Sequence, residues 1–279
     1  MGVKRERFGA EMGRFRRDFI TSCGIRSGDA GGMDYLDLSL PTAEENIALD
    51  EALLDEVETA AEKGSEPREC LRLWEPAAPM VVVGRNSTID GEVDVAFCRR
   101  EGIPILRRAS GGCAIVTGPG CLMYAVVLSY ELRPNLKQLD EAHRFVLDTL
   151  LTGLRPLVAN VDRKGTCDLV VGQHKFSGNS LRCRRNGLLY HGTLLYDFPL
   201  ELVSKCLKQP PREPEYRAGR EHAAFVMNLP VTAAAMKEGL RIAWSASEVR
   251  TAGPEDEVWR TAQGLIRPPE HSGFKVNGE

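Results

Sequence analysis

The sequence lacks the patterns that mark several large classes of protein. No apolar run approaches the roughly 18 residues that a membrane-spanning helix needs, and the longest are short stretches such as VVVG and AVVL. Charge of one sign is not in excess, because 36 Lys and Arg stand against 39 Asp and Glu, a formal net charge of −3. We therefore expect no membrane partner, no nucleic-acid partner and a cytoplasmic protein.

The cysteines are also not arranged as a metal site or a redox motif. Eight are present, but they form no CxxC pair and no His-containing metal spacing. Such scattered cysteines are typical of reduced thiols, most of which pack as small apolar side chains. No internal repeat is present. A single enzyme-sized domain is the expectation for this length and apolar content.

Three segments divide the chain. Residues 1–32 are rich in Arg and interrupted by Gly, and they lack a secretory apolar core, so we predict a disordered extension. Residues 33–248 are predicted to form one catalytic domain. Residues 249–279 are predicted to be a tail without a full accessory domain, since this stretch is polar and marked by Pro.

The pattern of elements predicts a mixed fold. Thr42 and Glu45 form a capping box before a run of helical periodicity that ends at Gly64. Short strand-like runs follow, with further helices expected over about 136–154, 200–207 and 230–248. Strand pairs mixed with a few helices, without regular βαβ alternation, indicate an α+β fold with a mixed, largely antiparallel β-sheet flanked by helices.

The segment from residue 168 to residue 198 is predicted to form three strands. Its turns are expected at Gly172, at Gly178 and at Asn186-Gly187, because Asn-Gly between two apolar runs is a strong hairpin signal.

The segment RRASGGCAIVTGPG, residues 107–120, holds residue types that bind anions. Gly111 and Gly112 follow Ser110, and glycine permits positive φ and close backbone approach, so that successive N–H groups can converge on an anion. Arg108 would add a bidentate contact to a phosphate. The alternative is an ordinary Gly-Gly turn with exposed arginines.

Two further segments carry charged or unusual side chains. Lys175 lies in CDLVVGQHKFSGNS, where it could stabilise a transferring phosphoryl group or an acyl phosphate, or be a solvated lysine at a strand edge. Asp168 could pair with Lys175 across a tight hairpin, or be a carboxylate at the edge of a turn. His191 precedes Gly192 in an apolar strand, where a glycine weakens packing unless backbone or ligand comes close. A core histidine is the alternative.

These segments together carry a resemblance to a known family. VGRNSTIDGEVDVAFCRREGIPILRRASGGCAIVTGPG, DLVVGQHKFSGNSLR and HGTLLYDF, in this order and spacing, resemble the lipoate–protein ligase and octanoyltransferase superfamily, whose catalytic domain is related to biotin protein ligase. The resemblance covers roughly residues 34–207 and is closest to lipoate–protein ligase A. It implies a biotin/lipoate protein ligase-like catalytic domain.

The resemblance also implies a reaction and its participants. Lipoate and ATP, with Mg²⁺, would form lipoyl-AMP, and the lysine of an apo lipoyl domain would then take the lipoyl group. Lys175 is the catalytic residue that the resemblance implies. The implied binding residues are Arg85, Arg108, Ser110, Gly111, Gly112, Cys113, Ala114, Asp168, Ser177, Gly178, His191 and Gly192. No metal ligand is assigned, because no cluster of carboxylates marks a site for Mg²⁺.

The sequence departs from the ligase pattern at several positions. Cys113 stands where ligases usually carry a third glycine, and TGPG is similar to HGPG in the octanoyltransferase branch. That branch moves octanoyl from acyl carrier protein through a cysteine thioester and uses no ATP. Cys113, Cys167 and Cys206 are the thiols to consider for this alternative. A third hypothesis is a non-catalytic, ligase-like subunit that binds lipoyl groups.

Two questions of partners stay open at this level. A separate accessory subunit could complete the enzyme, or this branch could need none. Arg182, Arg184 and Arg185, beside the Asn-Gly turn, could offer a basic patch to an acidic domain or form a solvated hairpin face.

Overall fold

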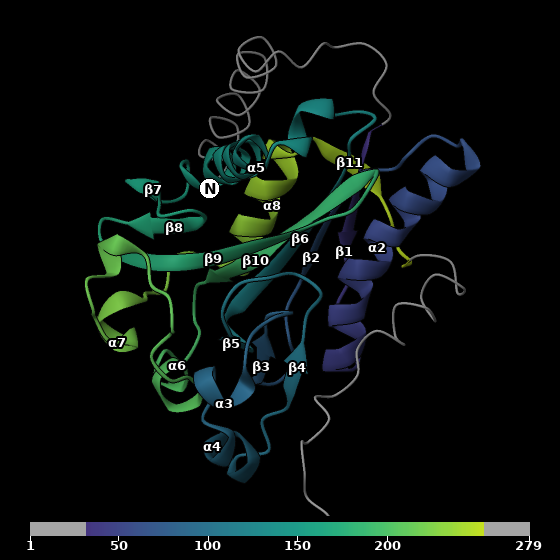
Figure 1. The fold of residues 1–279 in the computed structure, drawn as a ribbon. Coiled ribbons are helices and arrows are strands. Elements are labelled where there is room, and N and C mark those ends of the chain that lie inside the picture. Colours follow the sequence, from purple (N-terminus) through teal and green to yellow (C-terminus); the bar gives the residue numbers. More distant parts are fainter. Residues whose placement is uncertain (1–31, 254–279) are drawn as a thin grey trace, which may run out of the picture. The chain divides into compact units, whose positions relative to one another are not determined.

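The computed structural model describes residues 32–253 of the 279-residue chain, and the predicted extension and most of the predicted tail lie outside this range. The described part holds an eight-stranded sheet in the order β11-β1-β2-β6-β10-β9-β8-β7 and a three-stranded sheet in the order β4-β3-β5 (Figure 1). The strands are β1 (Met33–Asp37), β2 (Cys70–Trp74), β3 (Met80–Val83), β4 (Ile105–Arg107), β5 (Ile115–Thr117), β6 (Cys121–Ser129), β7 (Val161–Lys164), β8 (Asp168–Val171), β9 (His174–Cys183), β10 (Gly187–Leu195) and β11 (Ala246–Val249).

Helices connect and cover the two sheets. They are α2 (Ala43–Lys63), α3 (Ile89–Glu92), α4 (Val95–Arg100), α5 (Leu139–Leu154), α6 (Glu201–Cys206), α7 (His222–Phe225) and α8 (Ala233–Ala243), with 3₁₀ turns η1 (Pro134–Lys137) and η2 (Glu215–Arg217). In the large sheet β1 runs parallel to β2 and β11, whereas the pairs from β2 to β7 are antiparallel. The predicted class, α+β with a mixed and largely antiparallel sheet, is therefore confirmed. No helix within residues 32–253 has the length and apolar character required to cross a membrane.

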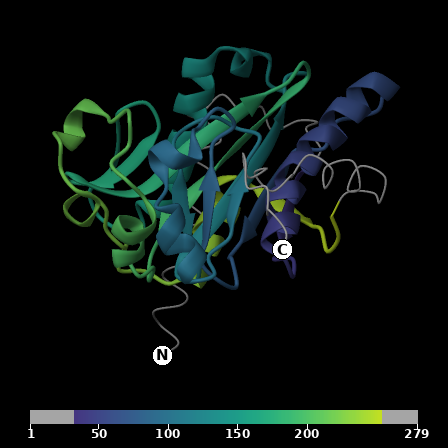
Figure 2. The same cartoon turned by 60° about the horizontal axis from the view of Figure 1, so that its bottom comes forward.

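The central strand β6 shows how the layers are built. All nine of its residues are buried, because both faces of the sheet are covered. Tyr124 and Val126 point into the cluster formed with α5 and α8, whereas Ala125 and Val127 pack against α2. Since successive side chains of a strand point to opposite faces, the odd-numbered positions of β6 face α2 and the small sheet. Figure 2 shows the small sheet in front of the long strands, with α2 beside it.

The helix α2 forms as the sequence predicts. The Thr42 hydroxyl accepts a hydrogen bond from the backbone N–H of Glu45, and the Glu45 carboxylate accepts one from the N–H of Thr42, so the capping box is complete. Gly64 ends the helix in the left-handed region, with φ of 65°. A box of this kind satisfies two of the N–H groups that lack helical partners.

One predicted turn is wrong. Gly172 turns the chain between β8 and β9 with φ of 62°, but Gly178 lies inside the continuous strand β9. A Cβ atom at Gly178 would lie 2.9 Å from Nζ of Lys175. The missing side chain therefore makes room for the lysine along the strand rather than turning the chain.

The hairpin predicted at Asn186-Gly187 is confirmed, although its turn is of another kind. Neither residue has a positive φ, so the two-residue type I′ turn that Asn-Gly favours does not form here. A Cβ at Gly187 would lie 2.8 Å from the carbonyl oxygen of Leu128, and this close approach accounts for the glycine.

Arginines of the hairpin face acidic residues of α2. Arg184 lies 2.8 Å from the carboxylate of Asp55 and 3.1 Å from that of Glu51, and Arg182 lies 3.9 Å from Glu51. Two of the three arginines proposed for a basic patch are therefore already paired within the chain.

Candidate active site

A cavity of about 480 Å³ lies on the face of the large sheet that α2 and the small sheet cover. Its lining includes residues of the glycine loop, residues 108–114, and of the covering segment, residues 210–226. The apolar part of the lining includes Val82, Ile115, Met123, Phe176, Leu195 and Val203. A cavity of this size with an apolar part and a few polar groups is typical of small-molecule sites.

The carbonyl groups of the glycine loop are held by donors from other segments of the chain. The Ser110 carbonyl accepts from the N–H of Arg85 at 2.8 Å, and the Gly111 carbonyl accepts from the Ser180 hydroxyl at 2.9 Å. The Gly112 carbonyl accepts from the Ser87 hydroxyl at 3.0 Å. Each of these three consecutive carbonyls thus has its own donor.

Because a trans peptide unit is planar, its N–H points opposite to its carbonyl oxygen. Fixing the carbonyls of residues 110, 111 and 112 therefore fixes the N–H groups of Gly111, Gly112 and Cys113. None of these three amides forms a hydrogen bond within residues 32–253, whereas the next amide, that of Ala114, donates to the Glu92 carboxylate at 2.5 Å. Gly112 and Cys113 line the cavity. The loop therefore offers successive free amides, the arrangement that binds anions.

Arg108 supplies a positive charge that no carboxylate in the described residues contacts. Its guanidinium donates to the carbonyls of Val82, Gly111 and Cys113 and to the Ser110 hydroxyl, at 2.6 to 3.1 Å. Burial lowers the pKa of Arg108 to about 10. The hydrogen bonds shape the loop, while the charge itself stays without a counter-charge in contact. An anion bound at the loop would supply one.

Lys175 and Asp168 meet as a charge pair on neighbouring strands. Nζ of Lys175 lies 2.6 Å from Oδ1 of Asp168, and Oδ2 accepts a hydrogen bond from the Tyr216 hydroxyl at 2.8 Å. Both members of the pair line the cavity. The pairing of Asp168 with Lys175, one of two alternatives left by the sequence, is the arrangement observed. Tyr216 belongs to the covering segment, so that segment holds the pair in place.

Two of the three candidate thiols lie at the cavity. Cys113 and Cys167 line it, whereas Cys206 is fully buried between helices and does not. Burial raises the pKa of Cys113, and the nearby Glu92 raises it further. Burial likewise raises the pKa of Cys167, whose Sγ donates to the carbonyl of Asn179 at 2.9 Å. Both thiols therefore stay protonated at neutral pH, which weakens them as nucleophiles.

The structure brings most of the predicted site residues together. Those that line the cavity are Arg108, Gly112, Cys113, Ala114, Asp168, Lys175, Gly178, His191 and Gly192. Ser110 and Ser177 are buried and do not belong to this lining, and Gly111 and the side chain of Arg85 are exposed outside it. A contact of any of these side chains with a ligand stays a prediction.

Sequence reasoning missed several residues of the site. Tyr216 and Arg212 come from a Pro-rich stretch that reads only as a loop, and no pattern marks either of them. Asp50 sits on the buried face of α2, where a carboxylate interrupts the apolar stripe. That interruption was the one available signal, because a buried acid needs a partner.

No group of three or more His, Cys, Asp and Glu side chains suited to a metal ion occurs in the described part of the chain. The carboxylates at the cavity are engaged, since Asp50 pairs with Arg72 at 2.5 Å and Asp168 with Lys175.

Comparison with known proteins gives the family. The model of the lipoyl protein ligase A/B catalytic domain matches residues 42–239. A protein of Aeropyrum pernix named for lipoate–protein ligase A is 35% identical over 150 residues, which cover 54% of this chain and 52% of that protein. Lipoate–protein ligase 1 of Staphylococcus aureus is 25% identical, over 79% of this chain and 65% of its own length. The octanoyltransferase LipM of Geobacillus kaustophilus is 27% identical, over 63% of this chain and 69% of its own length.

Solved structures show the same fold. A bi-partite lipoate protein ligase from Thermoplasma acidophilum superimposes with a TM-score of 0.65 at 19% identity, covering 85% of this chain and 92% of that one. A lipoate–protein ligase A bound with ATP gives a TM-score of 0.62 at 19% identity, covering 84% of this chain and 94% of that one.

The cavity that Arg108 and Lys175 line therefore lies in a member of an enzyme family whose named members are ligases and acyltransferases. The chain is a member of the lipoyl protein ligase A/B catalytic domain family. It spans about half the length of several curated relatives that it matches.

Proposed function

We propose that the chain is an ATP-dependent lipoate–protein ligase, which activates lipoate as lipoyl-AMP and transfers the lipoyl group to a lysine of a lipoyl domain. One observation carries the proposal: the free amides of Gly111, Gly112 and Cys113 lie beside the unneutralised charge of Arg108, with Lys175 on the same cavity. This array suits an acyl phosphate, whose negative charge and carbonyl both need fixed donors.

The two steps balance without any other reactant. A carboxylate oxygen of lipoate attacks the α-phosphorus of ATP, and the bond to pyrophosphate breaks. The uncharged amine of the acceptor lysine then attacks the carbonyl carbon, the bond to AMP breaks, and the amine loses a proton. In both steps the loop amides and Lys175 hold the α-phosphate, while the apolar lining holds the acyl chain.

Mg²⁺ enters with ATP as part of the substrate. The residues present fit this role, because Mg²⁺ is usually held by substrate phosphates, water and one or two carboxylates rather than by a cage of protein ligands. Both oxygens of the Asp168 carboxylate are engaged, by Lys175 and by Tyr216, so the phosphates and water would supply most of the ligands of the ion.

The second candidate function is transfer through a cysteine thioester, and it has one observation in its favour. Cys113 and Cys167 line the cavity, so either thiol could meet an acyl group there. We rank it second because the pKa of each thiol is raised rather than lowered.

A paired assay separates the two functions. The purified chain is given an apo lipoyl domain with either lipoate and Mg-ATP, or octanoyl–acyl carrier protein without ATP, and the intact mass of each protein is measured. The ligase predicts a lipoyl adduct on the domain in the first reaction only. A thioester on the chain in the second reaction would establish the transferase instead. Binding of lipoate without turnover by any donor would establish a binding subunit.

Lys175→Ala tests the role of the lysine within the same assay. We expect ligation to fall at least about a hundredfold, because a donor aimed at developing charge is lost. Lys237→Ala is the matched control, since Lys237 is ion-paired with Asp37 at 2.5 Å and does not line the cavity. Full activity of Lys175→Ala would falsify this assignment.

The accessory partner is a separate part of the proposal. The relative from Thermoplasma acidophilum is named as bi-partite. We propose that a second polypeptide contributes to activation of lipoate. The rate of pyrophosphate release is measured with the chain alone and with a candidate partner added. An equal rate in the two reactions would contradict this part of the proposal.

A further inference from the structure

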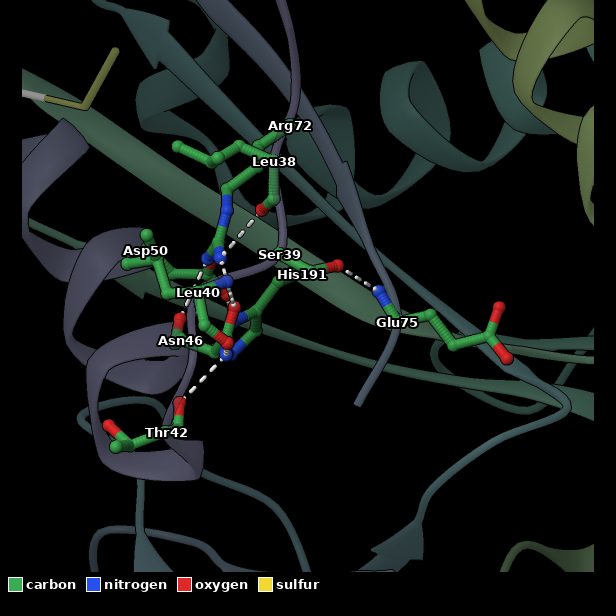
Figure 3. A network of polar contacts seen from close by, with 9 residues as sticks. All are labelled: Leu38, Ser39, Leu40, Thr42, Asn46, Asp50, Arg72, Glu75 and His191. Carbon is green, nitrogen blue, oxygen red and sulfur yellow. Dashed lines mark hydrogen bonds and ion pairs between the residues drawn. The ribbon is translucent and has the colours of Figure 1, made fainter. Parts of the chain in front are cut away.

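A buried ion pair underlies the glycine loop. Arg72 on β2 is fully buried, and its Nη1 donates to Oδ1 of Asp50 at 2.5 Å and to the carbonyl of Asn46 at 2.7 Å. Its Nη2 reaches the side-chain oxygen of Asn46 at 2.8 Å. Figure 3 shows the Arg72 side chain pointing at Asp50 and Asn46, with His191 close by. The carboxylate of Asp50 is thereby fixed, and its second oxygen is left for another donor.

His191 forms a hydrogen bond with that second oxygen of Asp50. Its Nδ1 lies 3.2 Å from Oδ2 of Asp50, and its Nε2 lies 2.6 Å from the hydroxyl oxygen of Ser110. A carboxylate only accepts hydrogen bonds, so in the neutral ring the one proton is on Nδ1. In this tautomer Nε2 can only accept, and the Ser110 hydroxyl therefore donates to it.

Both the proton and the oxygen of the Ser110 hydroxyl then have fixed partners. Its single proton goes to His191, and its oxygen accepts from Nε of Arg108 at 3.1 Å. The same guanidinium donates from Nη2 to the carbonyls of Gly111 and Cys113. A continuous chain of hydrogen bonds thus runs from Arg72 through Asp50, His191 and Ser110 to Arg108. Such chains strengthen one another in a low-dielectric interior.

The order Ser110, His191, Asp50 is that of a hydrolytic triad, but the chemistry differs. Ser110 is 1% exposed and does not line the cavity, so no substrate reaches its oxygen. Nε of Arg108 also donates to that oxygen, which withdraws electron density from it. A nucleophilic serine needs access to the substrate, which Ser110 does not have.

We infer that His191, held by Asp50 and Arg72, is a positioning residue that sets the glycine loop through Ser110 and Arg108. It acts from the wall of the cavity and makes no bond to the reacting atoms. The inference rests on the proposed function in one respect, because the loop is proposed to hold the phosphate of the nucleotide.

Two substitutions of His191 separate its two hydrogen bonds. The amide of Gln reaches the place of Nε2, so His191→Gln can still accept from Ser110. The amide of Asn reaches the place of Nδ1, so His191→Asn keeps the contact with Asp50 and loses Ser110. If the role of His191 is to set Ser110, the KM for ATP rises about tenfold or more in His191→Asn and less than threefold in His191→Gln.

The change is expected in KM while kcat stays within about threefold, because the loop holds the phosphate before and during the reaction. A variant that merely unfolds in part would lower kcat and leave KM unchanged. Ser110→Ala should match His191→Asn, and the double variant should be no worse than either, since the two residues act as one unit. Additive losses, or equal losses in the Gln and Asn variants, would overturn the inference.

His143→Gln is the matched control. His143 also hydrogen-bonds at a β10 residue, with Nδ1 2.8 Å from the Tyr190 hydroxyl, but it lies on the other face of the sheet. We expect its KM for ATP to stay within about twofold of the unsubstituted protein. A rise equal to that of His191→Asn would show that any histidine loss near β10 has this effect, against the inference.

A readout without substrate keeps the inference separate from the proposed function. Nuclear magnetic resonance spectra that correlate the ring nitrogens with the ring protons assign the tautomer of His191 in the free protein. We expect the proton on Nδ1, and a change at Nε2 in Ser110→Ala. A proton on Nε2 would overturn the inference, whether or not the protein ligates lipoate.

Discussion

At the scale of single residues, the buried arginines Arg72 and Arg108 differ in what neutralises them. Arg72 contacts the carboxylate of Asp50, whereas Arg108 contacts only carbonyls and a hydroxyl within residues 32–253. A buried cation with uncharged partners carries a desolvation cost that a bound anion relieves. The site is therefore expected to gain stability when an anionic ligand binds.

Arg108→Lys tests how much the several donors of the guanidinium contribute to stability. A lysine cannot reach three carbonyls and a hydroxyl at once, so we expect the free energy of unfolding to fall by about 2 to 4 kcal/mol. Urea denaturation at neutral pH measures it. Arg100→Lys, at an exposed pair with Glu101, should change the value by less than about 0.5 kcal/mol. Equal effects in the two variants would contradict the account of Arg108.

The thiols of the cavity give a second prediction at this scale. Because the pKa values of Cys113 and Cys167 are raised by burial, their alkylation by iodoacetamide should be slow at pH 7 and speed up as the pH rises. Peptide mass mapping against the exposed Cys183 gives the comparison. The variant Cys113→Gly with Cys167→Ser should keep ligase activity, and its loss would favour the thioester route.

At the scale of elements, β9 and β10 show how glycines are used. Asn179 pairs with Gly192 across the two strands, and a Cβ at Gly192 would lie 1.9 Å from the side-chain oxygen of Asn179 and 2.8 Å from the backbone oxygen of Gly178. At Gly178 the nearest atom is instead the end of the flexible Lys175 side chain. Gly192 therefore leaves space for the Asn179 side chain and the backbone of β9, whereas Gly178 leaves space for the Lys175 side chain.

This difference predicts that one alanine substitution lowers stability and the other lowers kcat. Gly192→Ala should lower the free energy of unfolding by about 1 to 3 kcal/mol, because the backbone and the half-buried side-chain amide of Asn179 must shift. Gly178→Ala should change stability by less than about 1 kcal/mol but lower kcat, since Lys175 is pushed from Asp168. Thermal unfolding together with steady-state kinetics measures both. A stable Gly192→Ala, or full activity of Gly178→Ala, would count against the geometry.

How much of the fold the sequence predicts depends on the range of the interactions. The ends of α2 are set by Thr42, Glu45 and Gly64, which act within one turn, and these were predicted. The strands β7 and β11 were not predicted. VDRK of β7 is a polar edge segment in a tight hairpin with β8, and ASEV of β11 fell inside the helix predicted over 230–248, which ends at Ala243 because ASEV pairs with the distant strand β1. Gly178 was misread as a turn, since its function is to leave space for another side chain.

The residues of the site also differ in whether a local pattern of the sequence predicts them. Lys175 and the glycine loop carry motifs that sequence shows directly. Tyr216 and Arg72 take part only through contacts with residues that are 48 and 22 positions away, which no local pattern reports.

At the scale of the whole described region, burial of histidine makes stability depend on pH. Burial lowers the pKa of His143 below its ordinary value of 6.5. As pH falls through 6.5, the unfolded chain takes up a proton that the folded protein resists, so this group lowers stability progressively until its lowered folded-state pKa is passed.

His143→Gln should therefore flatten part of the acid side of the stability profile. Urea midpoints at pH 7.5 and pH 5.0 give the slope, and the drop between the two is expected to be smaller in the variant than in the unsubstituted protein. An equal or larger drop in the variant would show that this histidine does not contribute. The comparison uses the difference between pH values, because loss of the bond to Tyr190 lowers stability at both.

The carbonyls of Ser110, Gly111 and Gly112 are tied to Arg85, Ser180 and Ser87. The groups proposed to meet the nucleotide are main-chain amides, which only substitution by proline removes. A mutational scan restricted to side chains facing the cavity would accordingly overlook part of the binding energy. Selection for tighter or weaker nucleotide binding could instead work on Ser87, which holds the Gly112 carbonyl but does not line the cavity, so that a variant without any ligand contact would tune affinity.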